Sequence, residues 1–307
     1  MKALFGLAVA VAVLAGCAQV SRGDGFAGAV DIGDGRRLYL NCQGDGSPTV
    51  FIIPDKDDYA ATWNVVVPQD DPTRASPYDL VDRARLETSA HAVQPAVART
   101  TRVCAYDRPN TRPDGSYRSS SVPQPHSITQ DVDDIVKLVA AARLSTPMVV
   151  VAHSYGALVA DLLARTQPYL VSGLVFVEPT SEFLPRLARP GQQAAFDRAA
   201  RTPSGPGGEA FLAEDAFARI KAAPLFPKVP AIVLSSDKPP PPARSGQGDY
   251  TDFQTRQANG LLAETLQTDN VIIPGSGRDI MLDEPARVAE KIVEIVDRVR
   301  AGGVVGR

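Results

Sequence analysis

Ser154 stands where its residue type and its neighbours could support nucleophilic chemistry. It follows an apolar run at 148–152 and precedes a helical pattern at 158–165, with Ala152 and Gly156 two positions to either side. A sharp strand-to-helix turn needs small residues at those two positions, because a larger side chain would clash where the helix doubles back over the strand. Such a turn lifts the serine hydroxyl off the end of the sheet, where it can attack an ester-like carbonyl.

Apolar segments and helical patterns alternate along most of the chain, which is typical of a parallel sheet covered by helices on both faces. Strands are predicted at 30–32, 37–42, 49–53, 102–106, 148–152, 174–177, 231–234 and 270–273, and helices at 78–86, 127–139, 158–165, 253–266 and 285–299. Two segments interrupt this rhythm and are expected to form a lid: an insertion at 63–98 and a mostly helical excursion at 178–228.

The Ser154 segment matches the nucleophile elbow G-x-S-x-G, with Ala152 in place of the first glycine. In this context the chain resembles the α/β-hydrolase superfamily over about residues 30–299. The resemblance implies an α/β-hydrolase fold, which is a mostly parallel eight-stranded sheet in the order 1-2-4-3-5-6-7-8 with helices on both faces and a helical lid insertion. The folded domain is accordingly expected at 29–302.

The resemblance also implies catalytic partners for Ser154, in the chain order serine, acid, histidine. Asp237, after the strand at 231–234, is the first candidate for the acid, and Glu178 is the alternative. The histidine should follow the last strand, where the family commonly has G-x-G-H, but here the Gly-Ser-Gly frame is followed by Arg278. Arginine stays protonated and has no acceptor nitrogen, so Arg278 cannot act as the base, although it could pair with Asp237.

The three histidines of the chain all lie elsewhere. His153 precedes the nucleophile, and its ring is predicted to face away from the serine in a structural role. His126 precedes a helix that starts at the catalytic edge of the sheet, so it could reach the site if its loop folds inward, or it could be a solvated loop residue. Nothing in the sequence locates His91.

The predicted oxyanion hole also departs from the family. The backbone N–H of Tyr155 is retained as one donor, and Asp55 stands in the loop that should supply the other. This loop is usually rich in glycine, but here it carries Asp55, Asp57 and Asp58 around Lys56. Carboxylates near a developing oxyanion would oppose it, or else they point to solvent and only the loop backbone matters.

The N-terminus predicts export and lipidation. A basic start and a short apolar run end in Leu-Ala-Gly-Cys at Cys17, which resembles the bacterial lipobox. We therefore expect a signal peptide at 1–16 and a tether at 17–28 that anchors an exported domain to the cell envelope through lipidated Cys17. The two remaining cysteines, Cys42 and Cys104, could form a disulfide or remain buried thiols, and the resemblance puts them on neighbouring strands.

These features predict a lipid-anchored serine hydrolase that acts on a small-molecule ester or acyl substrate through Ser154, impaired because Arg278 replaces the histidine. The alternative is a non-catalytic envelope lipoprotein that uses the hydrolase pocket to bind an anionic or apolar ligand. The formal net charge of −3 argues against a nucleic-acid partner. We expect no cofactor and no metal, and membrane contact only through the lipid.

Overall fold

The architecture comes from a computed structural model that describes residues 25–110, 116–203, 205, 207–242 and 249–304. The predicted signal peptide and Cys17 lie outside the described residues. The predicted end of the tether is wrong, because β1 begins at Phe26, which pairs with Cys42 of the next strand. Among the helices that are described, none has the length and apolar character needed to cross a membrane.

Eight strands form one sheet in the order β1-β2-β6-β3-β7-β8-β9-β10. The β1–β2 and β2–β6 pairs are antiparallel, and the other pairs in the sheet are parallel. The short strands β4 and β5 pair with each other outside this sheet. The order of the eight strands confirms the one that the resemblance implies. The strands are β1 (Phe26–Gly33), β2 (Arg36–Gln43), β3 (Val50–Ile53), β4 (Val65–Val66), β5 (Glu87–Thr88), β6 (Val103–Tyr106), β7 (Met148–His153), β8 (Val171–Val177), β9 (Ala231–Ser236) and β10 (Asn270–Ile273).

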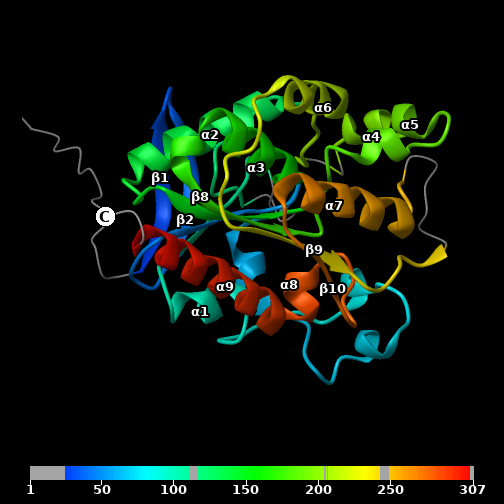
Figure 1. The fold of residues 1–307 in the computed structure, drawn as a ribbon, viewed down its shortest axis with the longest axis horizontal. Helices are drawn as coiled ribbons and strands as arrows, with labels where there is room; N and C mark the ends of the chain where they lie inside the picture. The colour runs from blue at the N-terminus through cyan, green and yellow to red at the C-terminus, as the bar shows by residue number, and fades with distance from the viewer. Residues whose placement is uncertain (1–24, 111–115, 204, 206, 243–248, 305–307) are drawn as a thin grey trace, which may run out of the picture.

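Helices cover both faces of the sheet, as Figure 1 shows. One face carries α2 (Ile128–Ala141), α3 (Tyr155–Thr166) and α6 (Ala213–Ala222), and the other carries α1 (Val93–Ala98), α8 (Ile280–Asp283) and α9 (Pro285–Val304). Successive residues of a strand point to opposite faces. Phe51 and Ile53 of β3 therefore join one apolar core, while Val50 and Ile52 join the other.

The remaining α-helices lie in the segments that follow β8 and β9 along the chain. They are α4 (Leu184–Leu187), α5 (Gln192–Ala200) and α7 (Asp252–Leu266). α7 contacts β9, β10 and α4, and α5 contacts α6. The predicted helices at 253–266 and 285–299 are confirmed by α7 and α9.

The predicted helix at 78–86 is wrong, because only a 3-10 turn at Val81–Arg83 forms there. Polar side chains satisfy the backbone in place of a continuing helix: Asp79 accepts the Val81 N–H, and Asp71 accepts the Arg85 N–H. The insertion at 63–98 is also not a lid as a whole. Its ends belong to the core, since Trp63 and α1 are buried against the sheet.

The disulfide is confirmed between Cys42 of β2 and Cys104 of β6. The two residues stand directly opposite each other on antiparallel strands. Both side chains are buried, with relative exposures of 1% and 0%. The bridge therefore fastens the N-terminal hairpin to the central, parallel part of the sheet.

Candidate active site

Ser154 occupies the sharp turn between β7 and α3. Its backbone dihedrals, φ 48° and ψ −116°, lie in a region that side chains rarely adopt, as expected of a nucleophile elbow. A Cβ atom on Gly156 would come within 2.5 Å of the carbonyl oxygens of Ile53 and Pro54. The structure thus gives the physical reason for the small residue at this position, which is the close approach of α3 to the end of β3.

Arg278 reaches Ser154 from the loop after β10, at the place where the family histidine was expected. Its Nη2 donates to Ser154 Oγ at 2.6 Å and also to the Asp55 carboxylate. Two contacts fix the backbone of Arg278: its N–H donates to Asp79 at 3.0 Å, and its carbonyl oxygen lies 3.1 Å from His153 Nε2. Ser154 Oγ accepts in this arrangement, so Arg278 binds the serine hydroxyl without taking its proton.

The sequence leaves open whether the carboxylates of this loop point to solvent or into the site. The Asp55 side chain points into the site. Its Oδ1 accepts the N–H of Tyr155 at 2.9 Å, and the Lys56 N–H also donates to the carboxylate. Burial alone would raise the pKa of Asp55, but Arg278, His153 and these two N–H groups outweigh it and lower the pKa. The backbone N–H groups of Tyr155 and Lys56, in the region where the resemblance predicts an oxyanion hole, thus donate to an internal carboxylate.

The two candidate acids lie in different surroundings. Asp237 is exposed, and its Oδ2 accepts the Gly275 N–H at 3.1 Å. The expected pairing of Arg278 with Asp237 is wrong, because the guanidinium turns to Asp55 beside the serine. Glu178 is buried and lines the same pocket as Ser154. Burial raises the pKa of Glu178 to about 7, against the opposing effects of hydrogen bonds from Ser236 and the charge of Arg278.

The histidines do not supply a base in the described part of the chain. His126 is buried, with its Nε2 at 3.0 Å from Asp131 Oδ2, and has no contact with Ser154 there. Its loop therefore folds inward, but toward α2. His153 lies as predicted, with its Nε2 directed to the Arg278 carbonyl oxygen, and His91 is exposed.

A pocket of about 760 Å³ opens above Ser154, Glu178 and Arg278. The excursion after β8 contributes part of its wall, and the insertion contributes Tyr78 and Asp79. Residues 238–240, 242 and 249–251, between β9 and α7, form a further wall that was not expected from the sequence. The apolar and aromatic lining comes from Leu184, Phe196, Pro239, Pro240, Pro242 and Tyr250. A proline run directly after a strand, at the carboxyl edge of the sheet, was the signal for this wall.

Metal ligation finds no support in the described residues, where no group of three or more His, Cys, Asp or Glu side chains is arranged to hold an ion. The polar groups of the site instead form one hydrogen-bonded set that joins Ser154, Arg278, Asp55 and Tyr155.

Several solved structures share the architecture at low sequence identity, which shows the fold alone. An N-acyl homoserine lactone degrading enzyme is 18% identical, with a TM-score of 0.56 over 87% of this chain and 100% of that one. A thermophilic esterase from Thermogutta terrifontis is 16% identical, with a TM-score of 0.55 over 90% and 99%. An alpha/beta hydrolase fold protein from Burkholderia ambifaria is also 16% identical, with a TM-score of 0.55 over 90% and 98%.

Comparison of the amino-acid sequence with known proteins agrees with the comparison of structures. An uncharacterised protein of Schizosaccharomyces pombe is 32% identical over 104 residues, which is 34% of this chain and only 18% of that protein. The model of the alpha/beta hydrolase family matches residues 72–291. Most of the chain is covered by this match, including the elbow and the loop of Arg278, and the protein therefore belongs to the alpha/beta hydrolase family.

Proposed function

We propose that this protein is a lipid-anchored, ligand-binding member of the family in which Ser154 does not carry out acyl transfer. One observation carries the proposal: a single nitrogen of Arg278 donates to both Ser154 Oγ and Asp55, while Asp55 also accepts the Tyr155 N–H. The position of the base and one donor of the oxyanion hole are thereby occupied by groups that cannot serve acyl transfer.

Two steps of the family reaction are blocked by this arrangement. Removal of the serine proton needs an acceptor, and Arg278 has none, since Asp55 raises its pKa further above the ordinary value. Stabilisation of the oxyanion needs free N–H donors, and loss of one such donor lowers kcat by about 10²–10³. At the Tyr155 N–H, the bound Asp55 carboxylate would in addition repel a developing negative charge.

The pocket retains the means to bind a small molecule. The Arg278 side chain is 55% exposed, and its Nε and Nη1 make no hydrogen bond within the described residues. These donors can take an anionic group of a ligand, because guanidinium donors match a carboxylate in charge and geometry. The proline and aromatic walls would cover an apolar body next to that group.

Serine-reactive labelling tests the loss of catalysis. We expect a fluorophosphonate probe to leave the purified protein unlabelled, as it does Ser154→Ala, and we expect Arg278→His to gain labelling. Strong Ser154-dependent labelling of the parent protein would refute the proposal. Thermal-shift measurements with medium-chain carboxylates then test ligand binding, with Arg278→Met as the variant in which the stabilisation should disappear.

Glu178 supports a second candidate, which is slow ester hydrolysis with this carboxylate as the base. A buried carboxyl with a pKa of about 7 has the proton affinity of a general base at neutral pH. It also lines the pocket that contains Ser154. Residual hydrolysis of p-nitrophenyl acetate should then rise with pH through about 7 and disappear in Glu178→Gln. A rate that is independent of both changes would exclude this candidate.

Lipid anchoring is proposed from the lipobox, since Cys17 lies outside the described residues. When the protein is expressed in a bacterium that is fed an alkyne fatty acid, the parent chain should become labelled and the Cys17→Ser variant should not. Equal labelling of both chains would refute lipidation at this residue. Fractionation should find the parent chain with the membranes and the variant in soluble fractions, because one lipid-modified residue would be the anchor.

A further inference from the structure

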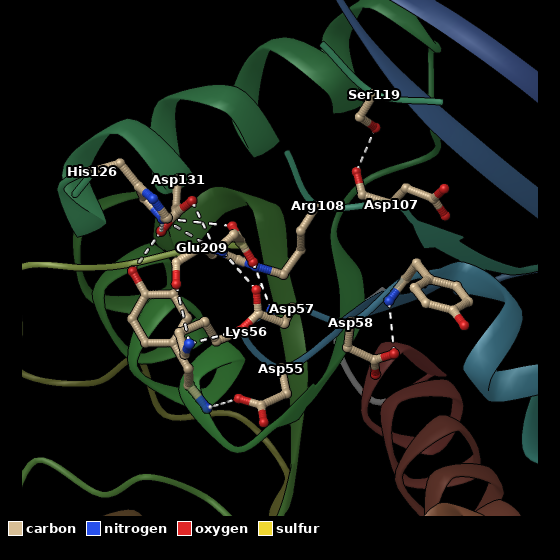
Figure 2. Close-up of polar contacts among 12 residues, drawn as sticks. Asp55, Lys56, Asp57, Asp58, Asp107, Arg108, Ser119, His126, Asp131 and Glu209 are labelled. Carbon is tan, nitrogen blue, oxygen red and sulfur yellow. Dashed lines mark hydrogen bonds and ion pairs between the residues drawn. The ribbon is translucent and has the colours of Figure 1, made fainter. Parts of the chain in front are cut away.

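The loop that carries Asp55 is clasped by Glu209, a buried residue of the excursion after β8 (Figure 2). The Asp57 N–H donates to Glu209 Oε2 at 2.8 Å, and the Glu209 N–H donates back to Asp57 Oδ1 at 2.6 Å. Lys56 Nζ donates to the Glu209 carbonyl oxygen at 3.1 Å. These three hydrogen bonds, called here the Asp57–Glu209 clasp, fix the backbone directly after Asp55.

The clasp is itself tied to the core of the protein. Arg108 Nε donates to Glu209 Oε2 at 2.9 Å, and Arg108 Nη2 donates to Asp131 Oδ1 at 3.1 Å. All three side chains are buried, and Figure 2 shows them close together beside Lys56 and Asp57. Asp131 also accepts the hydroxyl of Tyr155, the residue after the nucleophile, at 2.6 Å. Because breaking a buried ion pair leaves an uncompensated charge, this network resists rearrangement.

Asp55 is bound beside Ser154 as an external carboxylate would be. Two backbone N–H groups, of Tyr155 and Lys56, and the guanidinium of Arg278 donate to it. We call these three groups the oxyanion cradle. They combine positive charge with convergent N–H donors, which is the arrangement that proteins use to bind carboxylates. The pKa of Asp55 is lowered although burial acts to raise it, so the cradle favours the ionised carboxylate.

We propose that the oxyanion cradle is a carboxylate-binding site that the protein fills with its own Asp55 side chain, and that the Asp57–Glu209 clasp keeps Asp55 there. This inference rests on the proposed binding function and names its ligand class, a carboxylic acid whose head group competes with Asp55. Such a ligand binds only to the fraction of molecules in which Asp55 has left the cradle, so its apparent affinity is reduced in proportion.

The test uses the full chain purified in detergent, with sodium acetate as the probe and sodium chloride at equal ionic strength as the reference. Binding is followed by NMR line broadening of isotope-labelled acetate. We expect Asp55→Ala to bind acetate at least about ten-fold more tightly than the parent, the change that one charge-assisted hydrogen bond gives. Asp57→Asn, which weakens the clasp, should give a smaller gain.

Asp58→Ala is the matched control, because it removes a carboxyl group from the same loop. Asp58 accepts a hydrogen bond from Thr62 and one from the Tyr59 N–H, and it belongs to neither the cradle nor the clasp. Its acetate affinity should equal that of the parent. An equal gain in Asp58→Ala, or no gain in Asp55→Ala, would overturn the inference.

Asp55→Ser provides the same measurement if Asp55→Ala fails to fold, since its short side chain also leaves room for acetate. No gain in acetate affinity there would overturn the inference as well. Ser154-dependent labelling of the parent would instead refute the proposed function and leave the acetate result unchanged. The two failures can therefore be distinguished.

Discussion

Removal of the Cys42–Cys104 disulfide should lower the free energy of unfolding by about 4 kcal/mol. The bridge closes a loop with a sequence separation of 62, and the chain-entropy model assigns a constraint of roughly this size to such a loop in the unfolded state. Alanine fits in place of both half-cystines, because the two side chains are buried among apolar neighbours.

Urea unfolding followed by the fluorescence of Trp63 measures this effect. The chain has one tryptophan, and its side chain is fully buried, so its emission should report the loss of the core. The Cys42→Ala/Cys104→Ala variant and the parent unfolded under reducing conditions should give the same lowered midpoint. A loss below about 1 kcal/mol in both would refute the entropic reasoning, since it would mean that the unfolded chain does not gain the expected freedom.

Three further perturbations test the buried network and the elbow. Arg108→Met should lower the free energy of unfolding by about 3–5 kcal/mol, because it removes the guanidinium that two buried carboxylates share. Arg219→Met, which breaks an exposed pair, should cost less than about 1 kcal/mol, and equal losses would contradict this. Burial lowers the pKa of His126, but its carboxylate partner raises it by more, so the folded state binds this proton more tightly than the unfolded state does. Its stabilisation should be complete below about pH 6.5 and lost as the pH rises through the folded pKa, and unfolding midpoints measured across this range should show no such component in His126→Gln. Gly156→Ala should lower the melting temperature, since the new Cβ meets two backbone carbonyl oxygens, while Gly260→Ala, which meets nothing, should leave it unchanged or raise it.

The elements of the fold were predictable where their signals are local. Buried strands appear as continuous apolar runs, and the small residues around Ser154 mark the turn that presents it. The place of Arg278 beside Ser154 followed from the family resemblance, which puts the loop after the last strand next to the nucleophile. The helix predicted at 78–86 does not form, because the side chains of Asp71 and Asp79 accept backbone N–H groups of this segment. A helical pattern of residue types does not reveal such contacts.

The sequence by itself determined that Ser154 sits in an elbow and that an arginine stands where a base was expected. The first follows from residue types within a few positions of each other, and the second from the Gly-Ser-Gly frame before Arg278 together with the family resemblance. Only the tertiary structure decided where Asp55 points. A carboxylate in a loop can turn to water, and it turns inward only where donors offset its loss of hydration. The guanidinium that does so here is 223 residues away, and the residue that clasps the loop lies 152 residues from Asp57. Contacts of such separation form only when the chain is folded, and they decide whether the cradle is empty or filled.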